Sequence, residues 1–256
     1  MTDGLRVTIA GLDFYGHGSD GFIISPDGFS GWDDGVDMRL ENTARPYANG
    51  SFNLPVFQDA RTVSVSGNVF ADSPRKLAQL RNLLTGLMAG GLTGRIQVER
   101  FGDVQWADGR LAAKTMFTER GGQNCASFQV QVWCPDPRKF GDTKTVAVAT
   151  GAPVSVFHRG NYNATPSFVV KGSMPGGYTI TVNGWNYAVT LPLVSGKPHT
   201  VDYNNGRLYV NGVLAQNSLG NTNTTPIPPG ISVGVGLYPM TTGSGSADMT
   251  ITDTYI

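Results

Sequence analysis

Two short motifs in the sequence have the spacing of loops that bind cofactors or carry catalytic serines. "GHGSDG" at 16–21 matches G-x-G-x-x-G, which holds a dinucleotide pyrophosphate when a helix follows at once. "GISVG" at 230–234 matches the G-x-S-x-G motif, whose serine occupies a turn between a strand and a helix. Neither motif is followed by residues with helical periodicity. We therefore interpret the first as a turn and Ser232 as a strand residue.

Side chains that could bind a metal ion or activate a nucleophile are equally sparse. Three aspartates lie close together without EF-hand spacing, which favours a solvated acidic loop over a weak cation site: Asp33, Asp34 and Asp37. The histidines lie far apart and lack the spacing of zinc ligands: His17, His158 and His199. No nucleophile, base and oxyanion hole are brought together, so the sequence predicts a protein that is not an enzyme and has no cofactor or metal.

The composition is that of a β-rich protein with many turns. The 256 residues include 34 glycines and 15 prolines, and only 15% are charged. The 19 basic and 19 acidic side chains cancel, so no strong field attracts nucleic acid or acidic membranes. Neither a signal peptide nor an apolar run of the roughly 20 residues needed by a membrane helix is evident. We expect a soluble protein made in a cytoplasm, with no membrane insertion.

Charge density changes along the chain and predicts two domains. Residues 151–256 carry only seven charged side chains and are rich in Asn, Thr and Gly. A shift of this kind favours a domain boundary, which we place near "ATGAPVSVFHRGN". The predicted domains are 1–148 and 149–256. The fold class is mainly β: an N-terminal β-sandwich or ring domain with one α-helix, followed by a second β-sandwich.

One amphipathic helix is expected in the first domain, after the alternating strand "RTVSVSGNVF". Ser73 is a good N-cap, Pro74 suits the first helical position, and Gly90 and Gly91 should end the helix. Apolar residues at helical spacing form one stripe, which we assign to the core rather than to a partner groove: Leu77, Leu80, Leu83, Leu84, Leu87 and Met88.

The two cysteines, Cys125 and Cys134, are predicted to lie at opposite ends of one strand, "CASFQVQVWC". Nine steps of about 3.3 Å separate them by roughly 30 Å. Because a disulfide needs Cα atoms within about 7 Å, they cannot pair within one chain. Two buried thiols are typical of a reducing compartment.

Short strands at regular spacing make the second domain a predicted β-sandwich, with an Asn-Gly hairpin in "YNNGRLYVNG". Aromatic residues among its Asn-rich turns could bind a sugar or a protein partner, above all in "NGWNY", which contains Asn183, Trp185, Asn186 and Tyr187. Tyr203 and Tyr209 belong to the same group, and Asp202 and Arg207 could lie near by. Because Trp and Tyr at strand spacing are more often core or interface residues, we favour docking over sugar binding.

A dense turn, "WCPDPRKFG" at 133–141, lies between two predicted strands near the end of the first predicted domain. Pro135 and Pro137 each fix a φ angle, and Asp136 can cap its own turn through its side chain. One hypothesis is that this turn ends the first domain and directs the next strand, with Asp136, Pro137 and Gly141 as its key residues. The other is that it is only a rigid surface turn.

Residues 45–141 resemble the N-terminal domain of the distal tail proteins of phages with long, non-contractile tails. The shared order is a loop with a glycine, the strand "RTVSVSG", one helix after Ser-Pro, further strands, and a closing turn with an aromatic, Asp-Pro and glycine: Trp133, Asp136, Pro137 and Gly141. "GNYNATPSFVVKG" is similar to the start of that family's C-terminal domain, through Gly160, Asn161, Pro166 and Gly172. "GKPHTVDYNNGRLYVNG" and "IPPGISVGVG" are similar to its central strands and a Pro-Gly turn.

The resemblance implies a structural protein of the tail tip. Its first domain would form a closed ring, a hexamer, around the DNA channel at the end of the tail tube, and its second would be a galectin-like sandwich. The implied partners are the tail tube protein, the tape-measure protein, a tail-associated lysin or hub protein and receptor-binding proteins. DNA would only pass through, and the balanced charge suits that role. The protein would be assembled in the host cytoplasm into the virion. The alternative is a carbohydrate-binding module for adhesion to the host surface.

Overall fold

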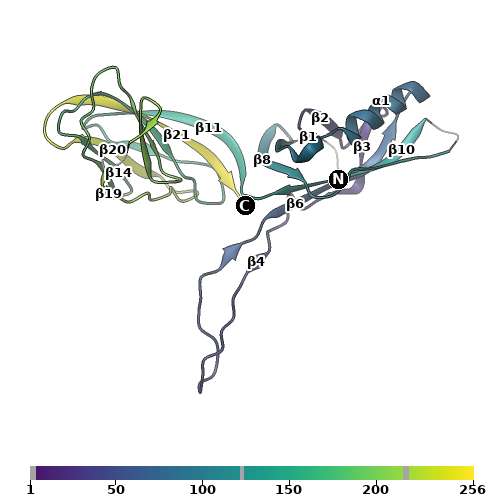
Figure 1. Ribbon diagram of the computed structural model, residues 1–256, viewed down its shortest axis with the longest axis horizontal. Helices are drawn as coiled ribbons and strands as arrows, with labels where there is room; N and C mark the ends of the chain where they lie inside the picture. Colours follow the sequence, from purple (N-terminus) through teal and green to yellow (C-terminus); the bar gives the residue numbers. More distant parts are fainter. Residues whose placement is uncertain (1–3, 122–123, 216–218) are drawn as a thin grey trace. The chain divides into compact units, whose positions relative to one another are not determined.

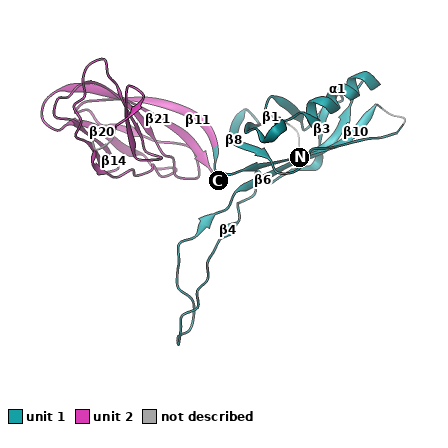
Figure 2. Cartoon of the chain, in the orientation of Figure 1, with its two compact units in different colours: residues 1–139, 256 teal, residues 140–255 magenta. Residues whose placement is uncertain are grey.

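A computed structural model describes residues 4–121, 124–215 and 219–256, and the chain divides into two compact units (Figure 2). Unit 1 runs to Lys139 and includes Ile256, and unit 2 is Phe140–Tyr255. The division falls inside "WCPDPRKFG" and at the start of β11 (Lys139–Ala149), whereas the sequence placed the boundary at 148/149, near the end of that strand.

Unit 1 is built on one sheet that closes on itself. Its strands are β1 (Leu5–Ile9), β2 (Leu12–Tyr15), β3 (Gly21–Ser30), β6 (Arg61–Phe70), β7 (Gly94–Arg100), β8 (Asp103–Leu111), β9 (Met116–Glu119) and β10 (Cys125–Cys134). The order is β8-β7-β1-β2-β3-β6-β10-β9, and β10 also pairs with β8 through Val132↔Leu111 and Trp133↔Arg110. Seven strands therefore form a closed ring of pairings.

Alternating side chains fill the interior of this sheet. In β6, Val63, Val65 and Val69 are buried, whereas the alternate residues Ser64, Ser66 and Asn68 are only partly buried. β10 pairs with β6 along its whole length, from Cys125↔Phe70 to Cys134↔Arg61. The two cysteines thus lie at opposite ends of one strand, as predicted, and neither forms a disulfide.

Helix α1 (Pro74–Thr85) begins as predicted but ends earlier. The Ser73 hydroxyl accepts a hydrogen bond from the Lys76 amide at 3.3 Å, and Pro74 is the first helical residue. Gly86, rather than Gly90 and Gly91, is the C-cap, and a short 3-10 turn, Ala89–Gly91, follows. Leu87 and Met88 are buried but lie beyond the helix.

The predicted apolar stripe was wrong at one position. Leu77, Leu80 and Leu84 are buried, whereas Leu83 is 57% exposed. Six residues at about 100° each place Leu83 roughly 120° around the helix from Leu77, outside the core-facing arc.

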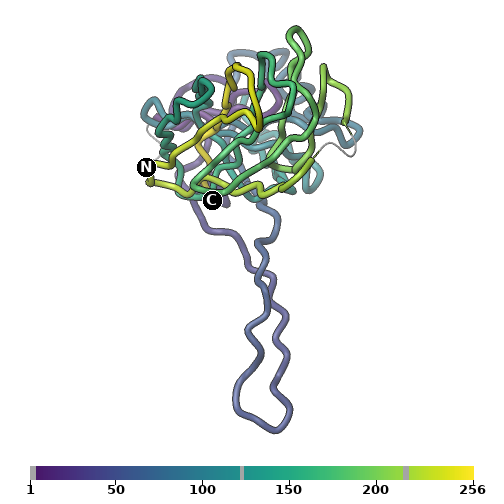
Figure 3. Tube along the Cα trace, turned by 90° about the vertical axis from the view of Figure 1, so that its left-hand side faces the viewer, coloured from purple at the N-terminus to yellow at the C-terminus, as the bar shows by residue number. Residues whose placement is uncertain are grey.

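Residues 35–60 form a long hairpin that runs out from unit 1, here called the arm (Figures 1 and 3). It contains β4 (Met38–Arg39) and β5 (Phe57–Gln58), and an isolated bridge joins Ala44 to Ser51 near the tip. From sequence, this stretch was expected to be loop only: a solvated acidic loop that includes Asp37, and the glycine-carrying loop that the family resemblance implies. The arm was missed because its residues do not pack on a core within the chain.

Unit 2 is the predicted two-sheet sandwich. One sheet has the order β18-β17-β16-β13-β21-β11 and the other β12-β20-β14-β15-β19. The remaining strands are β12 (Val154–Val156), β13 (Ser167–Ser173), β14 (Tyr178–Val182), β15 (Trp185–Val189), β16 (His199–Asp202), β17 (Arg207–Val210), β18 (Val213–Leu214), β19 (Leu219–Thr222), β20 (Val233–Pro239) and β21 (Ser244–Tyr255). The inner faces share one core, which includes Phe168 from β13 and Ile180 from β14. The predicted Asn-Gly hairpin joins β16 to β17.

The structure also places the two motifs that we did not assign to cofactor binding or catalysis. "GHGSDG" forms the turn between β2 and β3, as expected. Ser232 lies immediately before β20 and is not a strand residue, which corrects the interpretation from sequence. Among the described residues, no cluster of three or more His, Cys, Asp or Glu side chains could hold a metal ion. No helix in the described part of the chain is long and apolar enough to span a membrane.

Candidate interaction surfaces

The arm is an exposed apolar surface. Each of the following apolar arm residues is exposed to solvent, by between 37% and its full surface: Met38, Leu40, Tyr47, Phe52, Leu54, Val56 and Phe57. Tyr47, at the tip, is fully exposed and has a left-handed φ of 63°. Monomeric proteins seldom expose contiguous apolar patches without a binding role. The arm is therefore the strongest candidate for a protein contact in unit 1.

Few backbone hydrogen bonds hold the two sides of the arm together. Arg45 N donates to Gly50 O at 3.0 Å, Phe52 N to Thr43 O at 2.9 Å, and Asp59 N to Asp37 O at 2.8 Å. Residues 40–43 and 52–56 lie outside any strand. Backbone groups in these stretches can accept a further strand or be covered by a partner surface.

The root of the arm is the point where residues 31–34 leave the sheet and Arg61 returns to it. Arg61 is 2% exposed, and its Nη1 donates to the carbonyl oxygens of Gly31 at 2.7 Å and of Trp32 and Asp34 at 3.0 Å each. Burial lowers the pKa of Arg61 from its usual value, because the charged form loses hydration. The guanidinium thus ties the outgoing side of the arm to the incoming side.

The segment 133–141 is attached to the same root. Arg61 Nε donates to Pro137 O at 3.0 Å, and Lys139 Nζ donates to Trp32 O at 2.8 Å. Lys139 is 6% exposed, and burial, with a smaller effect of nearby Arg61, lowers its pKa to about 8. Burial also raises the pKa of the Cys134 thiol to about 11.

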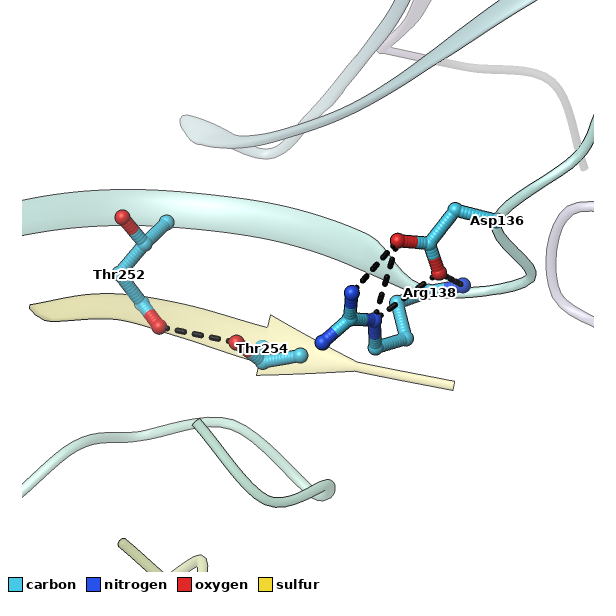
Figure 4. Close-up of polar contacts among 4 residues, drawn as sticks. All are labelled: Asp136, Arg138, Thr252 and Thr254. Atoms are coloured by element: carbon cyan, nitrogen blue, oxygen red, sulfur yellow. Dashed lines mark hydrogen bonds and ion pairs between the residues drawn. The ribbon is translucent and has the colours of Figure 1, made fainter. Parts of the chain in front are cut away.

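Asp136 caps its own turn, as the sequence predicted. Its Oδ1 accepts from the Arg138 amide at 3.0 Å, and its two carboxylate oxygens accept from the Arg138 guanidinium at 2.7–3.1 Å (Figure 4). Figure 4 also shows the Thr254 hydroxyl donating to the Thr252 carbonyl in β21.

Gly141, the last residue of the predicted turn, lies against the Tyr255 ring, where a Cβ atom would come within 3.0 Å of a ring carbon.

The predicted contact residues in "NGWNY" do not form one surface. Trp185 is 55% exposed, but Tyr187 is fully buried and its hydroxyl donates to Gly206 O at 2.9 Å. Tyr187 therefore cannot contact a ligand at the surface, and its burial raises its pKa to about 12. Trp185 and Asn186 are adjacent in β15, so their side chains point to opposite faces of the sheet.

The remaining polar residues of that group are also separated by the strand pattern. The Asn186 side-chain oxygen accepts from the Thr181 hydroxyl at 2.9 Å, and Asn183 occupies a turn with φ 51°. Asp202 and Arg207 face each other across the β16–β17 pair, and Tyr203, beside them, is buried. The sugar platform considered from sequence is not assembled by these residues.

Sequence reasoning missed the arm and Arg61. A signal for the arm was present, since Asn49-Gly50 is a hairpin turn dipeptide and Phe52, Leu54 and Val56 alternate after it. Nothing in the sequence distinguishes Arg61 from an ordinary surface arginine at the start of a strand. Its burial depends on a turn of the chain thirty residues earlier and on another that follows β10.

Comparison with protein families and with curated proteins gives no match for this sequence. Solved structures do match. The crystal structure of the SPP1 Dit protein (gp 19.1), presented as a paradigm of the hub of the adsorption apparatus in phages that infect Gram-positive bacteria, has a TM-score of 0.72 and 16% sequence identity. The match covers 98% of this chain and 99% of that one, so it includes residues ahead of position 45, where the sequence resemblance began.

Two structures of the phage P2 baseplate in its activated conformation are more distant. The form with Ca has a TM-score of 0.47 and 8% identity and covers 97% of this chain and 98% of that chain. The form with Sr has a TM-score of 0.45 and 9% identity and covers 97% of each. TM-scores below 0.5 support no conclusion about this chain. The SPP1 match, in contrast, spans both units of the chain. This chain therefore has the fold of the phage Dit hub protein, and at the level of the fold the resemblance to phage distal tail proteins is confirmed.

Proposed function

We propose that this chain is a structural protein of the phage tail tip, which forms a ring at the end of the tail tube and serves as a hub for other tail-tip proteins. The observation that carries this proposal is the fold match to SPP1 Dit over nearly the whole of both chains. A shared fold alone permits different functions. Here, however, the match covers both units of this chain, and unit 1 carries an arm with exposed apolar side chains.

The arm supports self-association as the first step of assembly. Its exposed apolar side chains would be covered if each arm lay on the neighbouring subunit, and a ring repeats that contact until it closes. We propose six subunits, with unit 1 around the channel. The absence of net charge suits a channel through which DNA passes without being retained.

The partners and the location follow from the same proposal. Unit 2 would project from the ring and dock receptor-binding proteins, and the ring would contact the tail tube protein, the tape-measure protein and a tail-associated lysin or hub protein. We propose no enzymatic activity, with assembly in the host cytoplasm and a final place in the virion. The turn with Asp136, Pro137 and Gly141 would end the ring-forming unit.

Labelling of intact virions tests this placement. Gold-conjugated antibodies against the purified chain should bind at the tail tip in electron micrographs, and antibodies against the major tail protein, the control, should label the whole tail. Labelling confined to the capsid, or only to unassembled protein, would reject the tail-tip hub.

The carbohydrate-binding alternative has no comparable support. Trp185 is exposed, but Tyr187 is buried and Asn186 points to the other face of the sheet. A sugar site usually combines an aromatic platform with hydrogen-bonding groups on the same face. We therefore assign unit 2 to docking, with Trp185 as the candidate anchor.

A further inference from the structure

The arm has little stiffness of its own, so its direction depends on its root. Among the described residues, its two sides are connected by the β4–β5 pair, the bridge Ala44–Ser51, a few backbone hydrogen bonds and two guanidinium–ring contacts, Arg39 over Phe57 and Arg45 over Phe52. A two-stranded ribbon without a packed face is marginal in water. For such a ribbon to meet a partner in a defined orientation, the chain must be held in place where the ribbon leaves unit 1.

The outgoing side of the root, residues 31–34, is fixed by backbone geometry. Gly31 has φ 80°, and a Cβ atom there would collide with the Thr62 carbonyl oxygen, so no other residue fits without displacement. The Gly31 amide donates to Asp34 Oδ2 at 2.9 Å, which holds the following turn. Trp32 is buried and packs into the core of unit 1.

The incoming side is tied to the outgoing side by Arg61. Three carbonyl oxygens of residues 31–34 accept from one nitrogen, Nη1, at 2.7–3.0 Å. A single side chain therefore fixes both the place and the direction of the turn that begins the arm. A guanidinium suits this task because its donors lie in one rigid plane.

A third segment completes the arrangement. Pro137 O accepts from Arg61 Nε at 3.0 Å, and Lys139 Nζ donates to Trp32 O at 2.8 Å. Residues 31–34, 61 and 137–139 are thus joined by two buried cations. The rigid turn "WCPDPRKFG" supplies both the carbonyl and the lysine.

This arrangement costs stability, which argues for a role other than stability. Both cations are almost fully buried, and their recorded hydrogen bonds are to carbonyl oxygens rather than to carboxylates. Arg61 Nη2 is buried with no hydrogen-bond partner among the described residues. Apolar side chains of similar size commonly stabilise such a site as well or better.

We propose that Arg61 and Lys139 are positioning residues, which lock the root and hold the arm in one orientation relative to unit 1. The lock concerns a single chain and does not depend on the proposed ring. What the arm then contacts does rest on the proposed function.

The orientation of the arm can be measured by electron spin resonance between two labels. In full-length protein with Cys125→Ala and Cys134→Ala, labels are attached through Leu40→Cys, an exposed arm position just beyond β4, and Gln79→Cys on helix α1. Dilution with unlabelled protein restricts the signal to pairs within one chain. We expect one narrow distance distribution, and a clearly broader one in Arg61→Met.

Leu84→Ala is the matched control, because it removes a buried side chain of unit 1 that lies outside the root. It should lower the melting temperature and leave the distance distribution narrow. If Arg61 only stabilised the fold, Arg61→Met would behave in the same way. Lys139→Met removes one hydrogen bond of the root and should broaden the distance distribution less than Arg61→Met does. Arg61→Lys should give a distribution narrower than that of Arg61→Met. Should Arg61→Met fail to fold, Lys139→Met provides the same test. A folded variant with an unchanged distribution, or a broad distribution before any substitution at the root, would overturn the proposal.

Discussion

Lys139 is the residue whose charge should be most visible in the stability of the protein. Burial lowers its pKa from 10.5 to about 8. Below pH 8 the side chain is charged in both the folded and the unfolded state, and the fold bears the full cost of burying that charge. Above pH 10.5 it is neutral in both states and the cost is absent. The contribution of Lys139 to the free energy of unfolding therefore rises between these pH values.

We predict that wild type gains stability relative to Lys139→Met as the pH rises from 8 to 10.5, by at most about 3 kcal/mol. Chemical unfolding followed by tryptophan fluorescence at each pH measures this difference. Comparison with the variant is needed because Cys134, whose pKa is raised from 9 to about 11, acts in the opposite direction above pH 9. Lys114→Met is the surface control. A difference that stays constant with pH would show that Lys139 is not buried as a cation.

Cys134 should be a slow thiol in the native protein. It is fully buried, and its raised pKa keeps little thiolate at pH 8. We expect slow reaction with a disulfide reagent in the native state and rapid reaction after unfolding, and Cys134→Ser should cost about 1–3 kcal/mol. Rapid modification of Cys134 under native conditions, located by mass spectrometry, would contradict the structure around β10.

Residue types alone could not predict these environments. Asp136 was recognised as a turn cap because that hydrogen bond is local, to an amide two residues away. Arg61 was not, because its partners come from turns far from it in sequence. Tyr187 was misjudged for a similar reason: only the pairing of β15 in the sheet decides that its ring faces the core.

At the scale of elements, helix α1 gives the sharpest contrast between neighbouring positions. We predict that Leu80→Asp lowers the free energy of unfolding by about 3–5 kcal/mol, because it places an unpaired charge against the core. Leu83→Asp, with the same change of side chain at an exposed position, should stay within about 0.5 kcal/mol of wild type. Thermal unfolding measures both. Equal effects at the two positions would mean that the helix face is assigned wrongly.

The arm should control self-association. Burial of one Phe or Leu side chain at a contact contributes about 1.5–3 kcal/mol, so the double variant Phe52→Ser and Leu54→Ser should weaken association at least about tenfold. Sedimentation velocity over a range of concentrations measures this shift. Val213→Ser with Leu214→Ser, which changes exposed apolar residues of unit 2, is the control and should leave association unchanged. The reverse pattern would place the contact in unit 2.

Elements were predictable where a side chain's surroundings follow from sequence spacing. The alternation in β6 and the N-terminus of α1 were predicted correctly because burial in a sheet and capping of a helix leave local patterns. The end of α1 was not, since Gly86 stops the helix while buried Leu87 and Met88 continue its apolar pattern. The arm was missed because its alternating residues have no core in the same chain.

For the whole molecule, composition was enough to predict a mainly β fold with two parts. The change in charge density marked the second unit, but the contacts divide the chain at 139/140, inside the Pro-rich turn, before the composition changes. The sequence pattern that indicates assembly is weaker than the patterns that indicate fold class and number of domains. In sequence the arm looks like a loop, and only the fold shows that the described residues leave its apolar side chains exposed.

Electron microscopy of the purified full-length protein at high concentration tests most directly whether this chain forms the proposed closed ring. We predict ring-shaped particles with a central hole and cyclic symmetry, six-fold in class averages, with the arm at the contact between neighbouring subunits. Monomers at every concentration, together with the absence of any ring of this protein in isolated tails, would contradict the account.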